Sequence, residues 1–147
     1  MLFILFSKNQ NVCIRDDAYK YILRGGIFVI TSKVIEIGES VPEFKEEMLV
    51  ILFGTSATPE LKPISVIHEF NDTPDNVLQV GTKVQLGDQT YTINQVGSSA
   101  NQNFEELGHV SIYFRSAQEE VLPGAVIASP KVFPTIKVGD EIKIWNE

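Results

Sequence analysis

The residues most able to do chemistry in this chain are its two histidines, His68 in the stretch ISVIHEF and His109 in LGHVSIYF. Alternation in the first stretch places His68 on the same face as Val66 and Phe70, so the ring belongs to an apolar strand face. Two interpretations follow. His68 is a core histidine bonded to a backbone carbonyl, or it is a neutral nucleophile at the mouth of an apolar pocket.

His109 shares its predicted strand face with Ser111 and Tyr113, whereas Val110 and Ile112 occupy the other face. One interpretation is an ordinary polar strand face. The other is a hydrogen-bond donor that faces a reactive centre and supports a nucleophile such as His68. The pattern by itself leaves both interpretations open.

A turn made of Gly97, Ser98 and Ser99 precedes a polar, helix-like stretch. The first amides of a helix have no partner within the helix, and they can bind an anion. We therefore expect this turn to be a candidate phosphoryl-binding site. Serine is also a common N-cap residue, so the signal is weak without other support.

Several familiar chemistries lack their motifs. The chain contains no phosphate-binding glycine-rich loop, no HExxH and no CxxC pattern, so we expect no bound cofactor and no metal site.

Its one cysteine, Cys13, excludes a disulfide framework. The net charge is −7 without a run of basic residues, which argues against nucleic acid as a partner. An acidic surface better suits a basic protein partner.

Short apolar or alternating segments separated by turn residues predict an all-β fold, a barrel or sandwich of short, mostly antiparallel strands with one or two short helices. Gly87-Asp88 lies between two alternating runs and indicates a hairpin. The expected strands lie within residues 27–38, 48–54, 63–70, 83–97, 109–114 and 141–145, and the expected helices within 40–49 and 98–108.

The length of 147 residues suits one domain, which we place at residues 27–147. Residues 1–26 differ in character, and MLFILF is too short to span a bilayer. We interpret residues 1–26 as an N-terminal extension, or as the product of a mis-assigned translation start with the true start near Ile27 or Val29.

The stretch VGSSANQNFEELGHVSIYF followed by EVLPGAVIA resembles the enzyme IIA component of the glucitol/sorbitol phosphotransferase system. The family pattern combines a V-G turn, an Ala-x-x-Asn stretch, L-G-H-V and a later P-G. Here these elements are Val96-Gly97, Ala100–Asn103, Leu107–Val110 and Pro123-Gly124. The resemblance covers residues 27–147, and its L-G-H-V and P-G block is the specific part.

This resemblance implies an enzyme of histidine phosphoryl transfer, with His68 of the V-I-H motif as the phosphorylated nucleophile and His109 as a supporting donor. It implies that the chain accepts a phosphoryl group from the phosphocarrier protein HPr and passes it to the cognate enzyme IIB, which works with the membrane component IIC. The expected location is cytoplasmic, at the membrane permease complex. Some family members carry a second histidine where this chain has Phe70, and this departure suggests that such a histidine is dispensable.

Two alternatives remain open at this stage. A non-catalytic β-barrel binding module would explain the strands, but not the Leu107–Val110 block. A metal hydrolase would need His68, His109 and a carboxylate such as Glu69. The sequence also leaves open the exact sugar, the order of the strands and whether the chain forms a homodimer.

Overall fold

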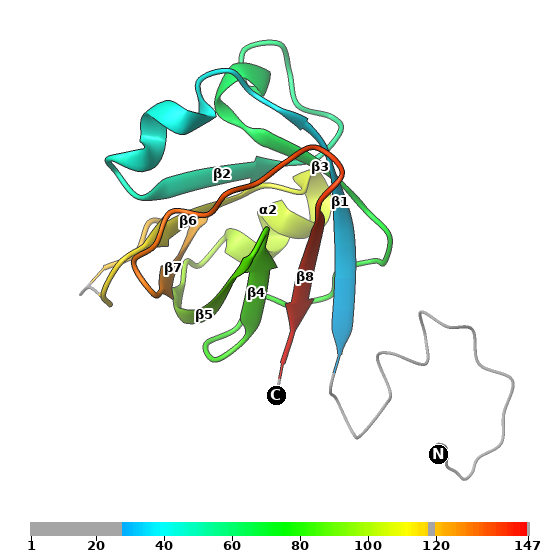
Figure 1. Cartoon of the computed structure of the whole chain (residues 1–147). Helices are drawn as coiled ribbons and strands as arrows, with labels where there is room; N and C mark the ends of the chain where they lie inside the picture. Colours follow the sequence, from blue (N-terminus) through cyan, green and yellow to red (C-terminus); the bar gives the residue numbers. More distant parts are fainter. Residues whose placement is uncertain (1–27, 118–119, 147) are drawn as a thin grey trace, which may run out of the picture.

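Eight strands of the described chain close into a barrel (Figure 1). The computed structural model describes residues 28–117 and 120–146. Its elements are β1 (Val29–Ile37), η2 (Val41–Lys45), β2 (Leu49–Phe53), η3 (Lys62–Ile64), β3 (Val66–Phe70), β4 (Lys83–Leu86), β5 (Gln89–Val96), α2 (Ala100–Leu107), β6 (Val110–Phe114), β7 (Ala125–Ser129) and β8 (Glu141–Trp145).

The order of strands around the barrel is β1-β3-β2-β6-β7-β5-β4-β8. Two neighbouring pairs, β2 with β3 and β6 with β7, are parallel, and the other six are antiparallel. The predicted all-β class is confirmed, and closure decides between barrel and sandwich. The predicted hairpin is also confirmed, because β4 and β5 pair across a turn in which Gly87 has a φ of 60°.

The core follows from alternation along the strands. On β6, for example, Val110, Ile112 and Phe114 are buried and point inward, whereas Ser111 and Tyr113 are partly exposed. Burial of such side chains is the main favourable contribution to folding, at about 25 cal/mol per Å² of apolar surface. The same alternation fixes which side of the sheet each candidate functional residue faces.

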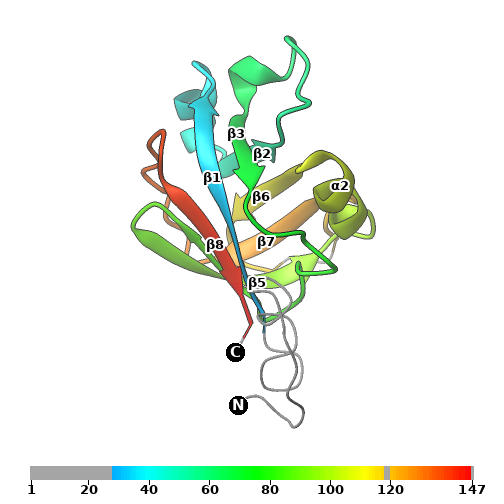
Figure 2. The same ribbon diagram turned by 90° about the vertical axis from the view of Figure 1, so that its right-hand side faces the viewer.

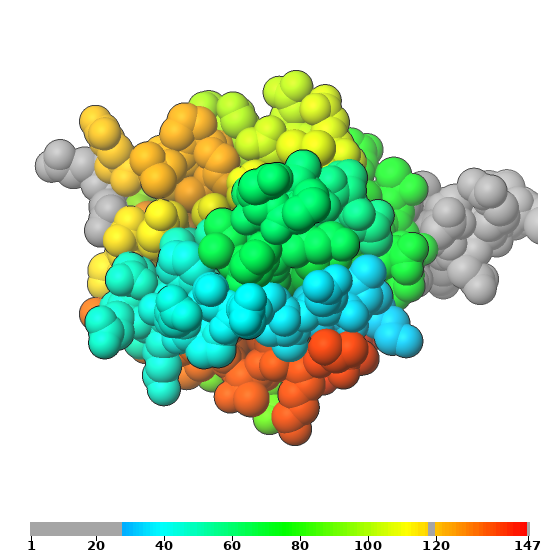
Figure 3. Space-filling model, turned by 90° about the horizontal axis from the view of Figure 1, so that it is seen from above, coloured from blue at the N-terminus to red at the C-terminus, as the bar shows by residue number. Residues whose placement is uncertain are grey.

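The segment between β2 and β3 makes a second, smaller apolar cluster on the outside of the barrel. Phe53 at the end of β2 and Ile67 on β3 pack there with Ala57 and Leu61. Viewed from above, this segment covers the middle of one end of the molecule, between the β1–η2 region in blue and cyan and the α2–β6 region in yellow (Figure 3). An outward-facing aromatic residue therefore lies under a covering loop instead of in solvent.

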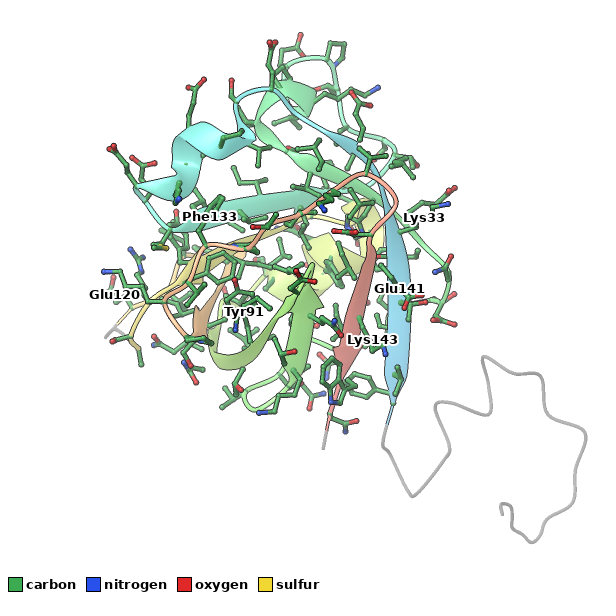
Figure 4. The ribbon with its side chains drawn as sticks, viewed as in Figure 1. Lys33, Tyr91, Glu120, Phe133, Glu141 and Lys143 are labelled. Carbon is green, nitrogen blue, oxygen red and sulfur yellow. The ribbon has the colours of Figure 1, made fainter. Side chains whose placement is uncertain are left out.

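The connection from β7 to β8 packs against the barrel through its aromatic and backbone groups. Its Phe133 packs edge-on against Phe114, with 6.5 Å between ring centroids, and the Tyr91 hydroxyl donates to the Val132 carbonyl. Figure 4 shows Tyr91 and Phe133 in the central part of the view, and charged side chains of β1 and β8, Lys33, Glu141 and Lys143, along one side.

The two predicted helical segments behave differently. Residues 40–49 form only a short 3₁₀ helix, Val41–Lys45, and Met48 then takes a left-handed φ of 53° that ends any helical path. Residues 98–108 form α2, whose Ala100 and Phe104 are fully buried in the core. Neither Ser40 nor Ser99 caps its helix through its side chain, although each occupies the N-cap position.

The predicted extension at residues 1–26 lies outside the described residues. Within the described part of the chain, no helix has both the length and the apolar character needed to cross a membrane.

Candidate functional site

His68 lies on β3 with its ring inside the barrel. It pairs across the sheet with Val34 of β1 and is 1% exposed. Phe70 meets the imidazole edge-on at 4.9 Å between ring centroids, and Phe104 of α2 stacks near it at 5.8 Å. Of the two interpretations of the sequence, the buried core position is the one that the structure adopts.

Both nitrogens of His68 are hydrogen-bonded. Nε2 lies 2.7 Å from the Gly108 carbonyl oxygen, and Nδ1 lies 2.9 Å from Ser32 Oγ. A carbonyl can only accept, so Nε2 carries the proton and Nδ1 accepts from the Ser32 hydroxyl. Burial lowers the pKa of His68, opposed in part by the bond to Gly108, and the ring is therefore neutral near pH 7.

His109 immediately precedes β6, and its side chain faces the outside of the barrel. Its Nδ1 lies 3.1 Å from the Leu52 carbonyl oxygen, and its ring stacks on Phe53 with 4.9 Å between centroids. The residue is only partly buried. Since a carbonyl can only accept, Nδ1 of His109 carries a proton and donates it to Leu52. Nε2 has no hydrogen-bond partner among the described residues.

Two glycines allow the end of α2 to approach β2 and β3. Gly108 ends the helix with a left-handed φ of 67°, and a Cβ there would lie 2.8 Å from the Gly54 backbone and 3.4 Å from His68 Nε2. The Gly54 amide donates to the Leu107 carbonyl at 2.8 Å. Figure 2 shows α2 beside the ends of β6 and β7. Without side chains at these glycines, the Gly108 carbonyl reaches the buried imidazole.

The predicted histidine pair is thus brought together, but with the sheet between the two rings. Gly108 accepts from His68, and the next residue in the chain is His109. His68 faces the core, whereas His109 faces the outer apolar cluster through Phe53. The residues are coupled through one peptide unit instead of sharing an open pocket.

The predicted phosphoryl-binding turn is placed elsewhere. Gly97, Ser98 and Ser99 precede α2, whereas both histidines lie at its other end, and eight helical residues span about 12 Å. The Gly97 amide already donates to the Ala125 carbonyl and the Ser99 amide to the Pro123 carbonyl, each at 2.8 Å. The structure does not bring this turn to the histidines, because the helix separates them, and carbonyls of the neighbouring strand and loop occupy the amides of Gly97 and Ser99.

Sequence reasoning missed Ser32, Phe53 and Gly54. Ser32 is 2% exposed and falls between Ile30 and Val34 on the inward face of β1. A polar residue within an apolar alternation was the available signal, since buried hydroxyls are normally hydrogen-bonded. The contacts of Phe53 with His109 and of Gly54 with Leu107 join residues more than 50 positions apart, and no local pattern indicates them.

The metal-hydrolase arrangement finds no geometric support. Glu69 follows His68 on β3 and is exposed on the opposite side of the sheet. In residues 28–117 and 120–146, no group of three potential ligands is placed to hold a metal ion.

Comparison with known proteins identifies the class to which this barrel and its histidines belong. The sequence model of the family "PTS system glucitol/sorbitol-specific IIA component" matches residues 29–143. Curated IIA components of that name from Shigella flexneri and Escherichia coli K12 are each 29% identical over 115 residues, covering 78% of this chain and 93% of the relative. The crystal structure of a PTS system IIA component from Enterococcus faecalis V583 is 34% identical with a TM-score of 0.71, covering 76% of this chain and 96% of that one.

These matches define a phosphocarrier component of the phosphotransferase system. The chain belongs to the glucitol/sorbitol-specific IIA family, as the resemblance of its L-G-H-V and P-G block implied.

Proposed function

We propose that this protein accepts a phosphoryl group on a histidine from phospho-HPr and passes it to a cognate enzyme IIB, within a permease that takes up glucitol (sorbitol) or a closely related sugar. The observation that carries the proposal is the family match, together with two histidines that meet at the end of α2, His68 through its bond to Gly108 and His109 as the next residue of the chain. A neutral imidazole with one nitrogen held as N–H can attack phosphorus through the other nitrogen and later release the group. In this assembly, the chain works at the membrane beside IIC.

The sequence-based assignment of the phosphoryl group to His68 stays a prediction. For that ring to react, Ser32 must release Nδ1 or Gly108 must release Nε2, and the ring must leave a position that is 1% exposed. Acceptance at His68 would thus need a local opening of the contact between β1, β3 and the end of α2. His109 as a supporting donor is equally a prediction, as is a homodimer.

The test of the function uses purified protein and HPr carrying ³²P-labelled phosphate. We expect acid-labile, base-stable label to appear on the chain, since phosphohistidine has that stability. Addition of an enzyme IIB should then remove the label, and IIB of a glucitol/sorbitol permease should do so faster than IIB of an unrelated permease. A non-catalytic binding module would retain no label, and that result would refute the proposal.

A further inference from the structure

Ser32 places a hydroxyl on a strand face that is otherwise apolar. Its neighbours on the inward face of β1, Ile30 and Val34, are fully buried, and Ser32 is buried with them. A hydroxyl that loses its bonds to water destabilises the fold unless the protein supplies a partner. The partner is His68, whose Nδ1 lies 2.9 Å from Ser32 Oγ. The buried hydroxyl is therefore bonded to the ring to which the sequence assigns the phosphoryl group.

The two hydrogen bonds of the His68 ring come from two different elements. Ser32 lies on β1, which runs beside β3 (Figure 2), and Gly108 ends α2. A half-turn of the imidazole about its bond to Cβ would place carbon atoms where both nitrogens now lie. Only one of the two ring orientations therefore satisfies both partners, and Ser32 and Gly108 together select it.

We infer that Ser32 is a positioning residue for phosphoryl transfer at His68, and that its hydroxyl holds the imidazole in the orientation from which the ring reacts. This inference rests on the proposed phosphocarrier function, with His68 as the acceptor. Ser32 acts through the ring and forms no covalent bond to phosphorus.

A hydroxyl suits this position because it can both donate and accept a hydrogen bond, whereas the Gly108 carbonyl can only accept. In the structure Ser32 donates to Nδ1, since Nε2 carries the proton that Gly108 accepts. In the other neutral tautomer of His68, Nδ1 carries the proton, and the same hydroxyl can accept it. The bond to Ser32 therefore survives a change of tautomer that would break the bond to Gly108.

The transfer step balances with either nitrogen of His68 as the nucleophile. The lone pair of that nitrogen forms the bond to phosphorus, and the bond from phosphorus to its donor atom in phospho-HPr breaks, returning its electron pair to that atom. The other nitrogen carries the ring proton. If Nε2 reacts, Ser32 accepts the proton of Nδ1. If Nδ1 reacts, the released Ser32 hydroxyl lies beside the phosphoryl group and can donate to one of its oxygens.

No other side chain of residues 28–117 and 120–146 is hydrogen-bonded to this imidazole. Phe70 meets the ring edge-on and Phe104 stacks near it, and neither can replace a hydrogen bond to nitrogen. Without Ser32, the nitrogens would be held by the Gly108 carbonyl alone. Phosphoryl transfer depends chiefly on positioning and electrostatics, so a less well oriented nucleophile should react more slowly.

The test compares Ser32→Thr with Ser32→Val, two β-branched side chains of similar shape that differ in the hydroxyl. Both add carbon to the barrel interior, so a difference between them measures the hydroxyl instead of the packing. Labelling by HPr carrying ³²P-phosphate is followed at a temperature where each variant is folded. We expect Ser32→Thr to be labelled near the wild-type rate and Ser32→Val about tenfold more slowly, the factor that one hydrogen bond supplies. Ser32→Ala needs no extra space and should be slowed as much as Ser32→Val.

Ile142→Val is the control for a general loss of stability. Ile142 is buried on β8 and pairs with Ser32 across the sheet, and its hydrocarbon side chain forms no hydrogen bond with the ring. Removal of one methylene group should lower the melting temperature and leave the labelling rate unchanged. A merely structural role of Ser32 would give the same result in Ser32→Ala, a lower melting temperature at an unchanged rate.

Long-range ¹H–¹⁵N spectra of protein labelled in histidine observe the hydrogen bond at the ring itself. In the wild type we expect a proton on Nε2 of His68 and a hydrogen-bonded Nδ1. Ser32→Val should shift the Nδ1 signal toward that of a free lone pair, and Ser32→Thr should keep it near the wild-type position. Ile142→Val should leave it in place.

The outcomes separate this inference from the phosphocarrier function. Equal labelling rates, or equal Nδ1 signals, for Ser32→Thr and Ser32→Val would overturn the inference and leave the function standing. Tryptic cleavage leaves His68 within residues 46–83 and His109 within residues 84–115, and label confined to the second peptide would also overturn it. Absence of label from the wild-type protein, with HPr that phosphorylates another IIA component, would refute the phosphocarrier function itself.

Discussion

The carbonyl oxygen of Gly108 lies 2.7 Å from Nε2 of His68, so the residue that ends α2 is bonded to a buried imidazole on β3. Forty positions separate the two residues in the chain. The bond joins a helix end to the barrel wall, and the chain continues from Gly108 directly into His109. The Gly108 peptide therefore contributes both to the packing of α2 on the barrel and to the position of His109.

The first prediction concerns pH. Burial lowers the pKa of His68 from its ordinary 6.5, so between the lowered value and 6.5 the unfolded chain binds more protons than the folded one. The contribution of His68 to the free energy of unfolding is thus complete above pH 6.5 and is lost as the pH falls below that value. The free energy of unfolding should fall by no more than about 1.4 kcal/mol per pH unit for this one group. Urea unfolding of the wild type and His68→Gln between pH 8 and pH 5 measures this. Equal pH dependence in the two proteins would contradict it.

The second prediction concerns Ser32. Ser32→Ala removes the hydroxyl that donates to His68 Nδ1 and leaves a buried acceptor unsatisfied, so we expect a loss of about 1–3 kcal/mol in the free energy of unfolding. Ser111→Ala on the partly exposed face of β6 is the control, with an expected change within about 0.5 kcal/mol. Denaturant unfolding compares them, and similar values for both variants would show that the Ser32 bond contributes nothing.

The third prediction concerns the contact between Gly108 and Gly54. Gly108→Ala must place a side chain at a φ of 67° and a Cβ 2.8 Å from the Gly54 backbone. Gly139→Ala is the matched control, because its φ is 97° but nothing lies within 4 Å. We expect the backbone conformation to cost about 1–3 kcal/mol at either position, and Gly108→Ala to cost clearly more because of the clash. Equal melting temperatures would mean that the helix end moves freely away from β2.

The fourth prediction concerns ionic strength and rests on HPr as the donor. The chain carries a net charge of −7, so we expect its phosphoryl donor to dock through a basic surface. Exposed charges are screened beyond about 10 Å at 0.1 M salt, so the rate of phosphorylation at limiting phospho-HPr should fall as salt rises. Stopped-flow or quench measurements over a range of salt concentrations test this. A rate independent of salt would exclude a docking role for the acidic surface.

The fifth prediction concerns residues 1–26. The pairing of β1 with β8 begins at Val29 and Trp145, and the Phe28 amide donates to Asn146 Oδ1 at 2.7 Å. These interactions all survive removal of residues 1–26, so the truncated protein should melt at the same temperature and be phosphorylated at the same rate. A lower melting temperature or poor expression would show that the extension contributes to the domain.

The sequence by itself determined much of the local structure. Alternation marked the inward faces of β3 and β6, the Gly87-Asp88 pair marked a hairpin, and Gly108 marked the end of a helix. Each of these depends on residues close together in the chain, where backbone preference and side-chain periodicity act directly. The L-G-H-V block likewise sufficed to identify the family, because it is a local pattern.

Only the tertiary structure decided what the candidate residues can do. Alternation placed His68 on an apolar face, but it could not show that Ser32 and Gly108, 36 and 40 positions away, occupy both ring nitrogens. It also could not show that Leu52 holds Nδ1 of His109 and leaves Nε2 open. The physical reason is that barrel closure sets these partners. Strand order and the parallel pairs β2–β3 and β6–β7 bring distant segments together, and no local preference of the chain encodes that order.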